Sequence, residues 1–254
     1  MTLPATAQIH GTTTLVGLLG WPTSHSLSPP MHNAGFSALG LDWAYVPLPT
    51  PPELLGDAVR GLQAMGFAGA NVTIPHKQAV IPLCDELDAV ATSASSVNTL
   101  VFDGDRILGS STDGDAVARQ VDPPGRRALV LGGGGSALAV VEALERAGAE
   151  VTMATRREAG WPPSPDGYDI LVNATPVKDE VIVAPHGGME VVDLAYLPDG
   201  TDTALVAAAR TAGCDVVVDG LDVLLYQGVA AFERWTGLAA PLVAMREALR
   251  GSVG

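Results

Sequence analysis

The stretch ALVLGGGGSALAVVEAL, residues 128–144, decides the fold. A short apolar segment leads through four glycines into an apolar run with helical spacing, which predicts the order strand, glycine loop, helix. A dinucleotide-binding loop requires this context. In such a loop Gly132 permits the tight turn, Gly134 lets a pyrophosphate approach the backbone, and the small Ala137 lets the helix pack on the strand. The alternative is a flexible glycine-rich turn without a ligand.

The end of the next predicted strand, 150–155, indicates which dinucleotide would fit. NAD binders carry an acidic residue there, which holds the ribose hydroxyls. In this chain Thr155 is followed by Arg156 and Arg157, and the first acidic residue, Glu158, comes late. Guanidinium groups bind a phosphate in a bidentate manner and stack on adenine, so the pair favours NADP(H). The alternative is a basic surface loop in an acidic protein.

Outward from this loop, apolar runs alternate with helix-like stretches along the chain. This alternation predicts parallel sheet joined by crossover helices. Residues 97–109 interrupt this alternation. They contain two apolar runs on either side of Asp103-Gly104, which predicts a hairpin. Before the glycine loop the predicted strands are 14–20, 43–49 and 69–74, and the predicted helices are 29–40, 51–66 and one that begins at Pro75.

After the break DPPGRR, residues 122–127, the alternation restarts, and we expect an α/β fold of two domains with the boundary near 113. The first domain comprises 1–112 and 221–254, and the second, of Rossmann type, comprises 113–220. The C-terminal helices are expected to return to the first domain. In the second half the predicted strands are 128–132, 150–155, 168–175, 190–196 and 215–220, and the predicted helices are 136–148, 203–213 and the tail 221–250.

Composition narrows the function classes. The chain has 254 residues, a hydrophobic content of 47% and a net charge of −14, which indicates a globular fold and argues against a nucleic-acid partner. No apolar run reaches the ~20 residues of a membrane span. The start MTLPATAQIH lacks the features of a signal peptide, so we expect a cytoplasmic protein. Cys84 and Cys214 lie far apart and are expected to be reduced thiols.

A pair of serines precedes the first predicted helix. In the segment TSHSLSPPMHN, residues 23–33, Ser26 and Ser28 point to the same side if the chain is extended, and two hydroxyls suit a carboxylate or a polyol. The alternative is that Ser28, ahead of two prolines, is an ordinary helix N-cap. His25, one residue before Ser26, is expected to be structural.

The stretch NVTIPHK, residues 71–77, contains a lysine in an unexpected place. Pro75 is favoured in the first turn of a helix, which would place Lys77 in that turn, where the dipole disfavours a cation by up to about 1 kcal/mol. Thr73 at the strand end and Lys77 would face one cleft, and such a lysine suits proton transfer near neutral pH. The alternative is a solvated surface lysine.

Three more polar residues have both a structural and a functional interpretation. Asp113 follows Thr112 at the start of a predicted helix, where either residue is a natural N-cap, and Asp113 alternatively pairs with Lys77. Asn98, in SVNTL, is either a turn residue or a partner for a hydroxyl. Gln227 lies on an apolar helix, where its amide needs a partner.

Taken together, these segments resemble the shikimate dehydrogenase family. The resemblance spans nearly the whole chain in the family's order. The matching segments are SHSLSPPMHNAGF, NVTIPHK, SVNTL, STDGD, LVLGGGGSA, NATPV, VVDLAY and GLDVLLYQGVAAFERWTG.

The resemblance implies reversible, NADPH-dependent reduction of 3-dehydroshikimate to shikimate by an N-terminal substrate domain and a Rossmann NADP domain. It implies that Lys77 and Asp113 are the catalytic pair and that no metal takes part. The chain would be a monomer or a homodimer with a small-molecule substrate. The implied substrate-binding residues are Ser26, Ser28, Thr73, Asn98, Tyr196 and Gln227, and the implied cofactor-binding residues are Gly132, Gly134, Gly135, Ser136, Ala137, Thr155, Arg156, Arg157 and Gly220.

The chain also departs from the family's usual pattern. A helix usually follows the second Rossmann strand, but 158–167 contains Pro162, Pro163 and Pro165 and is not expected to be helical. Lys178 and Asp179 follow NATPV where Gly-Met is usual, and Val223 replaces a methionine. The alternatives are therefore a paralogue acting on quinate or aminoshikimate, perhaps with NAD, and a ligand sensor on the same scaffold.

Overall fold

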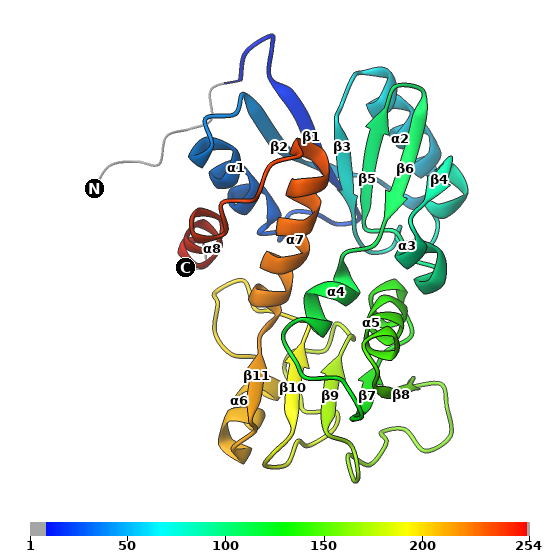
Figure 1. Cartoon of the computed structure of the whole chain (residues 1–254), viewed down its shortest axis with the longest axis vertical. Coiled ribbons are helices and arrows are strands. Elements are labelled where there is room, and N and C mark those ends of the chain that lie inside the picture. The colour runs from blue at the N-terminus through cyan, green and yellow to red at the C-terminus, as the bar shows by residue number, and fades with distance from the viewer. Residues whose placement is uncertain (1–8, 253–254) are drawn as a thin grey trace.

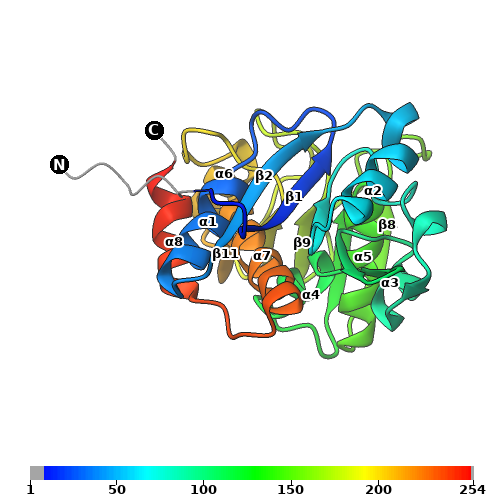
Figure 2. The ribbon, with the colours of Figure 1, turned by 90° about the horizontal axis from the view of Figure 1, so that it is seen from above.

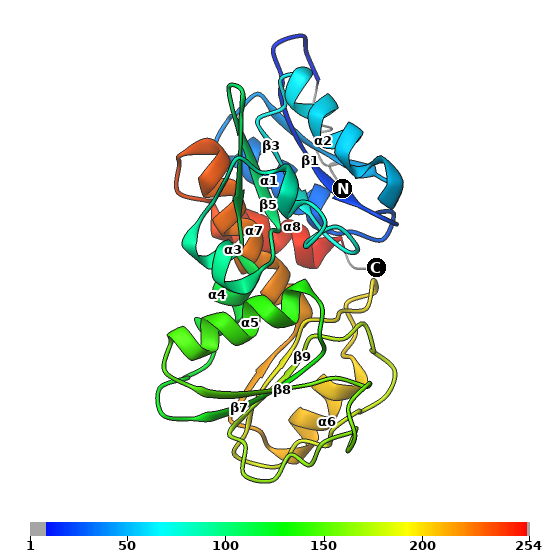
Figure 3. The same ribbon diagram turned by 90° about the vertical axis from the view of Figure 1, so that its right-hand side faces the viewer.

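A computed structural model describes residues 9–252 and places two β-sheets one above the other along the long axis (Figure 1). The upper sheet is built from the N-terminal part of the chain and the lower sheet from the part that follows. Helices cover both sheets, and Figure 3 shows α4 (Asp113–Ala118) and α5 (Gly135–Arg146) at the level where the two halves meet.

The N-terminal sheet is mixed. In spatial order its strands are β2 (Trp43–Pro49), β1 (Thr14–Gly20), β3 (Gly69–Val72), β5 (Thr99–Asp103), β6 (Arg106–Ser110) and β4 (Glu86–Leu87). β1 is parallel to β2 and β3, whereas β5 runs antiparallel to both β3 and β6. The predicted hairpin is confirmed, because Asp103 pairs with Arg106 and Gly104 takes a positive φ of 59° in the turn. The helices of this half are α1 (Ser28–Ala38), α2 (Leu55–Ala64) and α3 (Ala89–Ala94).

The helix expected from Pro75 is absent, and that prediction is wrong. Residues 75–80 form turns, and the carbonyl of Lys77 accepts from the backbone N–H of Val97 at 2.9 Å instead of from a donor one turn further on. The N–H of Ile81 bonds to Gln78, and the next residue, Pro82, has no N–H with which to continue a helix. Lys77 therefore lies in a turn and not in the first turn of a helix of its own, although its ammonium bonds to Asp113 and Ser136 at the starts of α4 and α5.

The second sheet is parallel throughout, as expected for a Rossmann-type half. In spatial order its strands are β11 (Val216–Val218), β10 (Glu190–Asp193), β9 (Ile170–Asn173), β7 (Arg127–Leu131) and β8 (Glu150–Ala154). Residues 155–169, between β8 and β9, contain no helix, which confirms the prediction for 158–167. Strand order reverses at β7, whose neighbours are β8 and β9, so a ligand-binding crevice is expected at their carboxyl ends. α6 (Ala204–Ala212) joins β10 to β11.

The last two helices return to the first half, as predicted. α7 (Gly220–Thr236) starts directly after β11 and runs up to the N-terminal sheet, and α8 (Leu242–Gly251) packs on α1. Figure 2 shows α1, α7 and α8 grouped on one side of that sheet. At its far end α7 is fixed by Trp235, whose indole N–H donates to the Leu100 carbonyl at 2.9 Å.

The core between α1, β2 and α7 contains an unpartnered histidine. His32 is fully buried, its ring stacks on Tyr45 at 4.5 Å, and neither ring nitrogen has a hydrogen-bond partner among the described residues. Burial lowers the pKa of His32 to about 3, because a charged imidazole would lose its hydration there. The ring is therefore neutral and packs as an aromatic side chain.

Two further sequence expectations concern membrane-spanning segments and the state of the two cysteines. Over residues 9–252 no helix combines the length and apolar character needed to cross a bilayer. Cys84 and Cys214 are both free and partly buried. Burial raises the pKa of the Cys84 thiol to about 11, so it stays protonated near neutral pH.

Close contact between α4 and α5 predicts that Gly114→Ala destabilises the fold. A Cβ at Gly114 would lie 2.1 Å from the Ala139 carbonyl oxygen, so the two helices would have to move apart at a cost of roughly 1–3 kcal/mol. Urea unfolding measures the change in the free energy of unfolding. The control is Gly61→Ala on α2, where the nearest side-chain atom is 4.0 Å away and a small gain in stability is expected. Equal stability of Gly114→Ala and the unmodified protein would contradict this account of the packing.

Candidate active site

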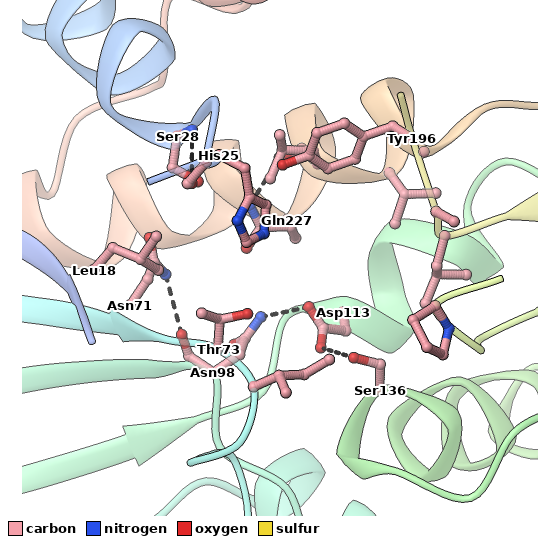
Figure 4. A pocket seen from close by; sticks show the side chains of 18 of the residues that line it. Leu18, His25, Ser28, Asn71, Thr73, Asn98, Asp113, Ser136, Tyr196 and Gln227 are labelled. Atoms are coloured by element: carbon pink, nitrogen blue, oxygen red, sulfur yellow. Dashed lines mark hydrogen bonds between the residues drawn. The ribbon is translucent and has the colours of Figure 1, made fainter. Parts of the chain in front are cut away.

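A cavity of about 310 Å³ lies between the two halves and is lined by residues of both. Figure 4 shows polar side chains that converge on it from β3, α1 and α7 on one side and from the start of α5 and the segment after β10 on the other, with Leu18 of β1 as an apolar neighbour. The cavity brings together both residues of the predicted catalytic pair and all six predicted substrate-binding residues. From the predicted cofactor set only Ser136 and Gly220 line it.

The centre of the site is a lysine–aspartate pair. Lys77 lies in the turn after β3 and Asp113 is the first residue of α4, and the ammonium of Lys77 donates to the Asp113 carboxylate. The side chains of the two residues are only 12% and 9% exposed, so the charges are largely removed from water and need each other. Both nevertheless line the cavity, where a ligand can reach them.

Asn98 fixes the carboxylate from the other side. Its side-chain amide donates to Asp113 at 2.7 Å and to the Thr112 hydroxyl at 2.8 Å, and its carbonyl oxygen accepts from the backbone N–H of Thr112 at 3.0 Å. Asn98 immediately precedes β5, and the hairpin thereby holds the start of α4 in place. Thr112 occupies the N-cap position without capping, because its hydroxyl bonds to Asn98 and to the Gln227 carbonyl.

The serine pair lies at the start of α1. Ser28 is the first residue of the helix and is buried, and its backbone N–H donates to the Ser26 hydroxyl at 3.2 Å. The N-cap position belongs to Leu27, whose side chain makes no cap bond, so the interpretation of Ser28 as an N-cap does not hold. Tyr196 lines the cavity after β10. Burial raises the pKa of the Tyr196 hydroxyl, partly offset by a hydrogen bond from the Leu27 backbone.

The remaining polar side chains line the same space. Thr73 follows β3, and Gln227 projects from α7 with its amide donating to the Leu224 carbonyl at 2.8 Å. Among the cavity residues to which sequence assigned no binding role are His25, which Figure 4 shows pointing into the space, and buried Asn71. The alternation of polar residues around each could have indicated them, since His25 lies between serines and Asn71 lies two residues before Thr73.

Ser136 connects the pair to the glycine loop. It is the second residue of α5, and its hydroxyl accepts from Lys77 at 2.9 Å and donates to Asp113 at 3.2 Å. Sequence alone grouped Ser136 with the cofactor-binding residues and gave no sign of this contact. The loop therefore reaches the lysine–aspartate pair directly.

The glycine loop has the close approaches that its sequence predicts. Gly132 has a φ of 127°, and a Cβ there would lie 2.9 Å from the Ala174 carbonyl oxygen. Gly134 is the N-cap of α5, and a Cβ on it would meet open space. A Cβ on Gly135 would lie 3.0 Å from the Cβ of Lys77. Ala137 is fully buried against the sheet. No side chain caps the first N–H groups of α5, which fits a phosphate.

The arginine turn lies beside this loop. Thr155, Arg156 and Arg157 follow β8, and the Thr155 side chain would be 3.0 Å from a Cβ on Gly133. Both arginines are exposed, and neither has a carboxylate within 4 Å over the described residues. Glu158 bonds to Thr155 at 2.9 Å. Gly220, the last residue of the predicted cofactor set, begins α7. A Cβ on Gly220 would lie 2.4 Å from the Ala195 carbonyl oxygen.

Fold and cavity define a two-sheet α/β protein of the dinucleotide-binding type, with a cleft that contains a buried lysine–aspartate pair. Two family models match the chain: the shikimate dehydrogenase substrate binding domain over residues 18–100 and the shikimate 5′-dehydrogenase C-terminal domain over residues 220–250. A shikimate dehydrogenase (NADP(+)) from Rubrobacter xylanophilus is 45% identical over 96% of this chain and 98% of its own length. The chain belongs to the shikimate dehydrogenase family.

Solved structures agree with this assignment. A crystal structure of a shikimate dehydrogenase in complex with NADP⁺ superposes with a TM-score of 0.90 at 30% identity and 99% coverage of both chains. The shikimate 5-dehydrogenase of Thermus thermophilus, in complex with NADP(H) and shikimate, gives a TM-score of 0.82 at 31% identity, covering 94% of this chain and 99% of that one.

Ser136→Ala is predicted to expose Lys77 to amine-reactive reagents. The substitution removes one of the two hydrogen-bond partners of Lys77, a loss of ~1 kcal/mol, so acetylation of Lys77 should become roughly fivefold faster. Mass spectrometry gives the rate relative to Lys178, the second of the two lysines in the chain. Ser24→Ala, in an exposed loop, is the control. An unchanged ratio in Ser136→Ala would show that the hydroxyl does not hold the lysine.

Proposed function

We propose that the protein catalyses the reversible, NADPH-dependent reduction of 3-dehydroshikimate to shikimate, a step of aromatic amino-acid biosynthesis. The observation that carries the proposal is the Lys77–Asp113 pair, which lies in a cavity lined by hydroxyl and amide groups and is bonded to the glycine-loop helix through Ser136. The names of the relatives and the ligands of the related crystal structures support the same activity.

The residues of the second half fit a dinucleotide. The crowding at Gly132, the open space at Gly134 and the unblocked start of α5 form a cradle for a pyrophosphate. The exposed Arg156 and Arg157 beside this loop suit the 2′-phosphate of NADP(H). When bound, NADPH supplies the hydride for the carbonyl carbon of the substrate.

Lys77 then has the proton-transfer role. Its ammonium donates a proton to the oxygen of the carbonyl as that oxygen gains negative charge, and in the reverse direction the neutral amine accepts the proton of the hydroxyl. Asp113 orients the ammonium and stabilises its charge, and Asn98 orients Asp113. The Lys77 cation also polarises the carbonyl before hydride arrives, which is electrostatic stabilisation of the developing alkoxide.

The substrate-binding residues surround this centre. We assign the substrate carboxylate to the hydroxyls of Ser26 and Ser28, with Tyr196 beside them, because two hydroxyls at the start of α1 face the cavity. Hydroxyls on the ring are assigned to Thr73, Asn98 and Gln227, whose polar groups line the same space. A rigid set of donors and acceptors discriminates against analogues that lack a matching hydroxyl.

The same proposal covers the domain division and the partners. We assign 1–112 and 221–254 to substrate binding and 113–220 to NADP(H), with the protein a monomer or a homodimer. Support for the division comes from the two separate sheets and from the contacts of α7 and α8 with α1.

Lys77→Met is predicted to abolish most turnover while leaving binding nearly intact. Loss of the proton donor should lower kcat for shikimate oxidation by roughly 10²- to 10⁴-fold, with a much smaller change in the Kd for shikimate. Steady-state NADPH absorbance gives kcat and calorimetric titration gives Kd. Arg119→Met is the matched control, since it removes an exposed cation outside the cavity and should leave kcat unchanged.

Two outcomes would contradict the proposal. An unmodified protein that binds shikimate without any turnover would be a ligand sensor rather than an enzyme. A higher kcat/KM for quinate or aminoshikimate than for shikimate would identify a paralogue with a different substrate.

Removal of both arginines is predicted to change cofactor preference. In the double variant Arg156→Gln, Arg157→Gln the kcat/KM for NADP⁺ should fall by roughly 10- to 100-fold, because a charge-assisted bidentate contact to the 2′-phosphate is lost. The kcat/KM for NAD⁺ should change little. Arg60→Gln, an exposed cation on α2, serves as the control. If the unmodified protein already prefers NAD⁺, the role given to the arginine pair is wrong.

A further inference from the structure

The chain contains only two lysines, Lys77 and Lys178, and both line the same cavity. Of its fourteen basic residues the other twelve are arginines, and within residues 9–252 no arginine lines the cavity. The net charge of the chain is −14, so an anionic ligand is repelled unless a cation at its binding site offsets this charge. Lys77 has a catalytic role in the proposed function, whereas Lys178 has none so far.

Lys178 lies on a well-anchored loop. The loop follows β9, and the Asn173 side chain holds it by donating to the Val177 carbonyl at 3.2 Å and accepting from the Thr175 N–H at 3.1 Å. The Lys178 carbonyl itself accepts from Ala204 at the start of α6 at 2.8 Å. The backbone is therefore fixed on both sides of Lys178, and Lys178 lines the cavity together with Thr175 and Pro176.

The Lys178 ammonium has no carboxylate within 4 Å over residues 9–252, although Asp179 and Glu180 follow it directly and are exposed. Lys77, by contrast, is paired with Asp113. A half-buried cation that faces a cavity without a protein partner gains most from an anionic ligand.

The position of the loop determines which anion this would be. The carboxyl ends of β7 and β9 flank the point where strand order reverses, and a pyrophosphate binds there in Rossmann folds. The loop touches the glycine loop, since a Cβ on Gly132 would lie 2.9 Å from the Ala174 carbonyl oxygen. The hydroxyls assigned to the substrate carboxylate lie instead at and just before the start of α1, in the N-terminal half.

We propose that Lys178 is a cofactor-binding residue whose ammonium binds the pyrophosphate of the dinucleotide, opposite the N–H groups at the start of α5. This inference rests on the proposed function, because it takes the crevice as an NADP(H) site. Lys178 supplies a cation at this loop, where no other described lysine or arginine lines the cavity except the paired Lys77. The contact compensates for the acidic character of the chain.

The test compares Lys178→Met and Lys178→Arg with the unmodified enzyme. In Lys178→Met the KM for NADP⁺ and the Ki of 2′-phospho-ADP-ribose should rise roughly tenfold, with kcat and the KM for shikimate nearly unchanged. The Ki of adenosine 2′,5′-bisphosphate, which lacks the pyrophosphate, should stay within about twofold. Lys178→Arg should restore most of the affinity because it keeps the charge, and Arg119→Met should alter none of these constants.

Several outcomes would overturn the inference. A rise confined to the KM for shikimate would place Lys178 on the substrate carboxylate, and equal losses for both nucleotide inhibitors would place it on the adenosine side. An unchanged KM for NADP⁺ in Lys178→Met, in an enzyme whose unmodified form turns over, would leave the lysine without a role in binding. If Lys178→Met lowers the Tm strongly and Lys178→Arg does not restore nucleotide affinity, its role is structural. Absence of turnover in the unmodified protein would instead refute the proposed function.

Discussion

Two opposite charges held between two sheets, with little access to water, set the requirements for the surrounding structure. The Lys77–Asp113 pair is stable only if every remaining hydrogen-bonding atom finds a partner, since unpaired buried charges cost several kcal/mol. Asn98 supplies one partner from the hairpin and Ser136 supplies another from α5. The hairpin, the turn after β3 and the starts of α4 and α5 must therefore meet at one point, and this requirement fixes how the two halves sit.

Close backbone packing brings these elements together. Gly114 lets α4 approach the backbone of α5, and Gly135 lets α5 approach Lys77. α7 begins at the edge of the second sheet and ends with Trp235 bonded to a strand of the first, so it spans both halves. The cavity is the space left between these elements, and hydroxyl, amide and charged side chains form part of its lining.

Local patterns predicted most of the fold and much of the site. The glycine loop, the hairpin turn and the proline-rich 158–167 segment were all predicted correctly, because in each case the backbone depends on residues adjacent in sequence. The helix expected at Pro75 failed because the Lys77 carbonyl bonds to a distant N–H, that of Val97. The Ser136 contact and the shared cavity of the two lysines depend on tertiary arrangement alone, which spacing along the chain does not contain.

The returning C-terminal helices have a consequence for the order in which the molecule forms. The core around Val16 and Leu18 is completed by residues from Leu221 to Leu249, near the opposite end of the chain. During synthesis the N-terminal strands and α1 emerge first, yet the face that α1 shares with α7 and α8 stays incompletely covered until the last helices leave the ribosome. The second sheet, whose strands lie between 127 and 218, is available as a whole earlier. The half that is translated first is therefore the half that completes its folding last. A chain released early would expose an apolar sheet face in that half.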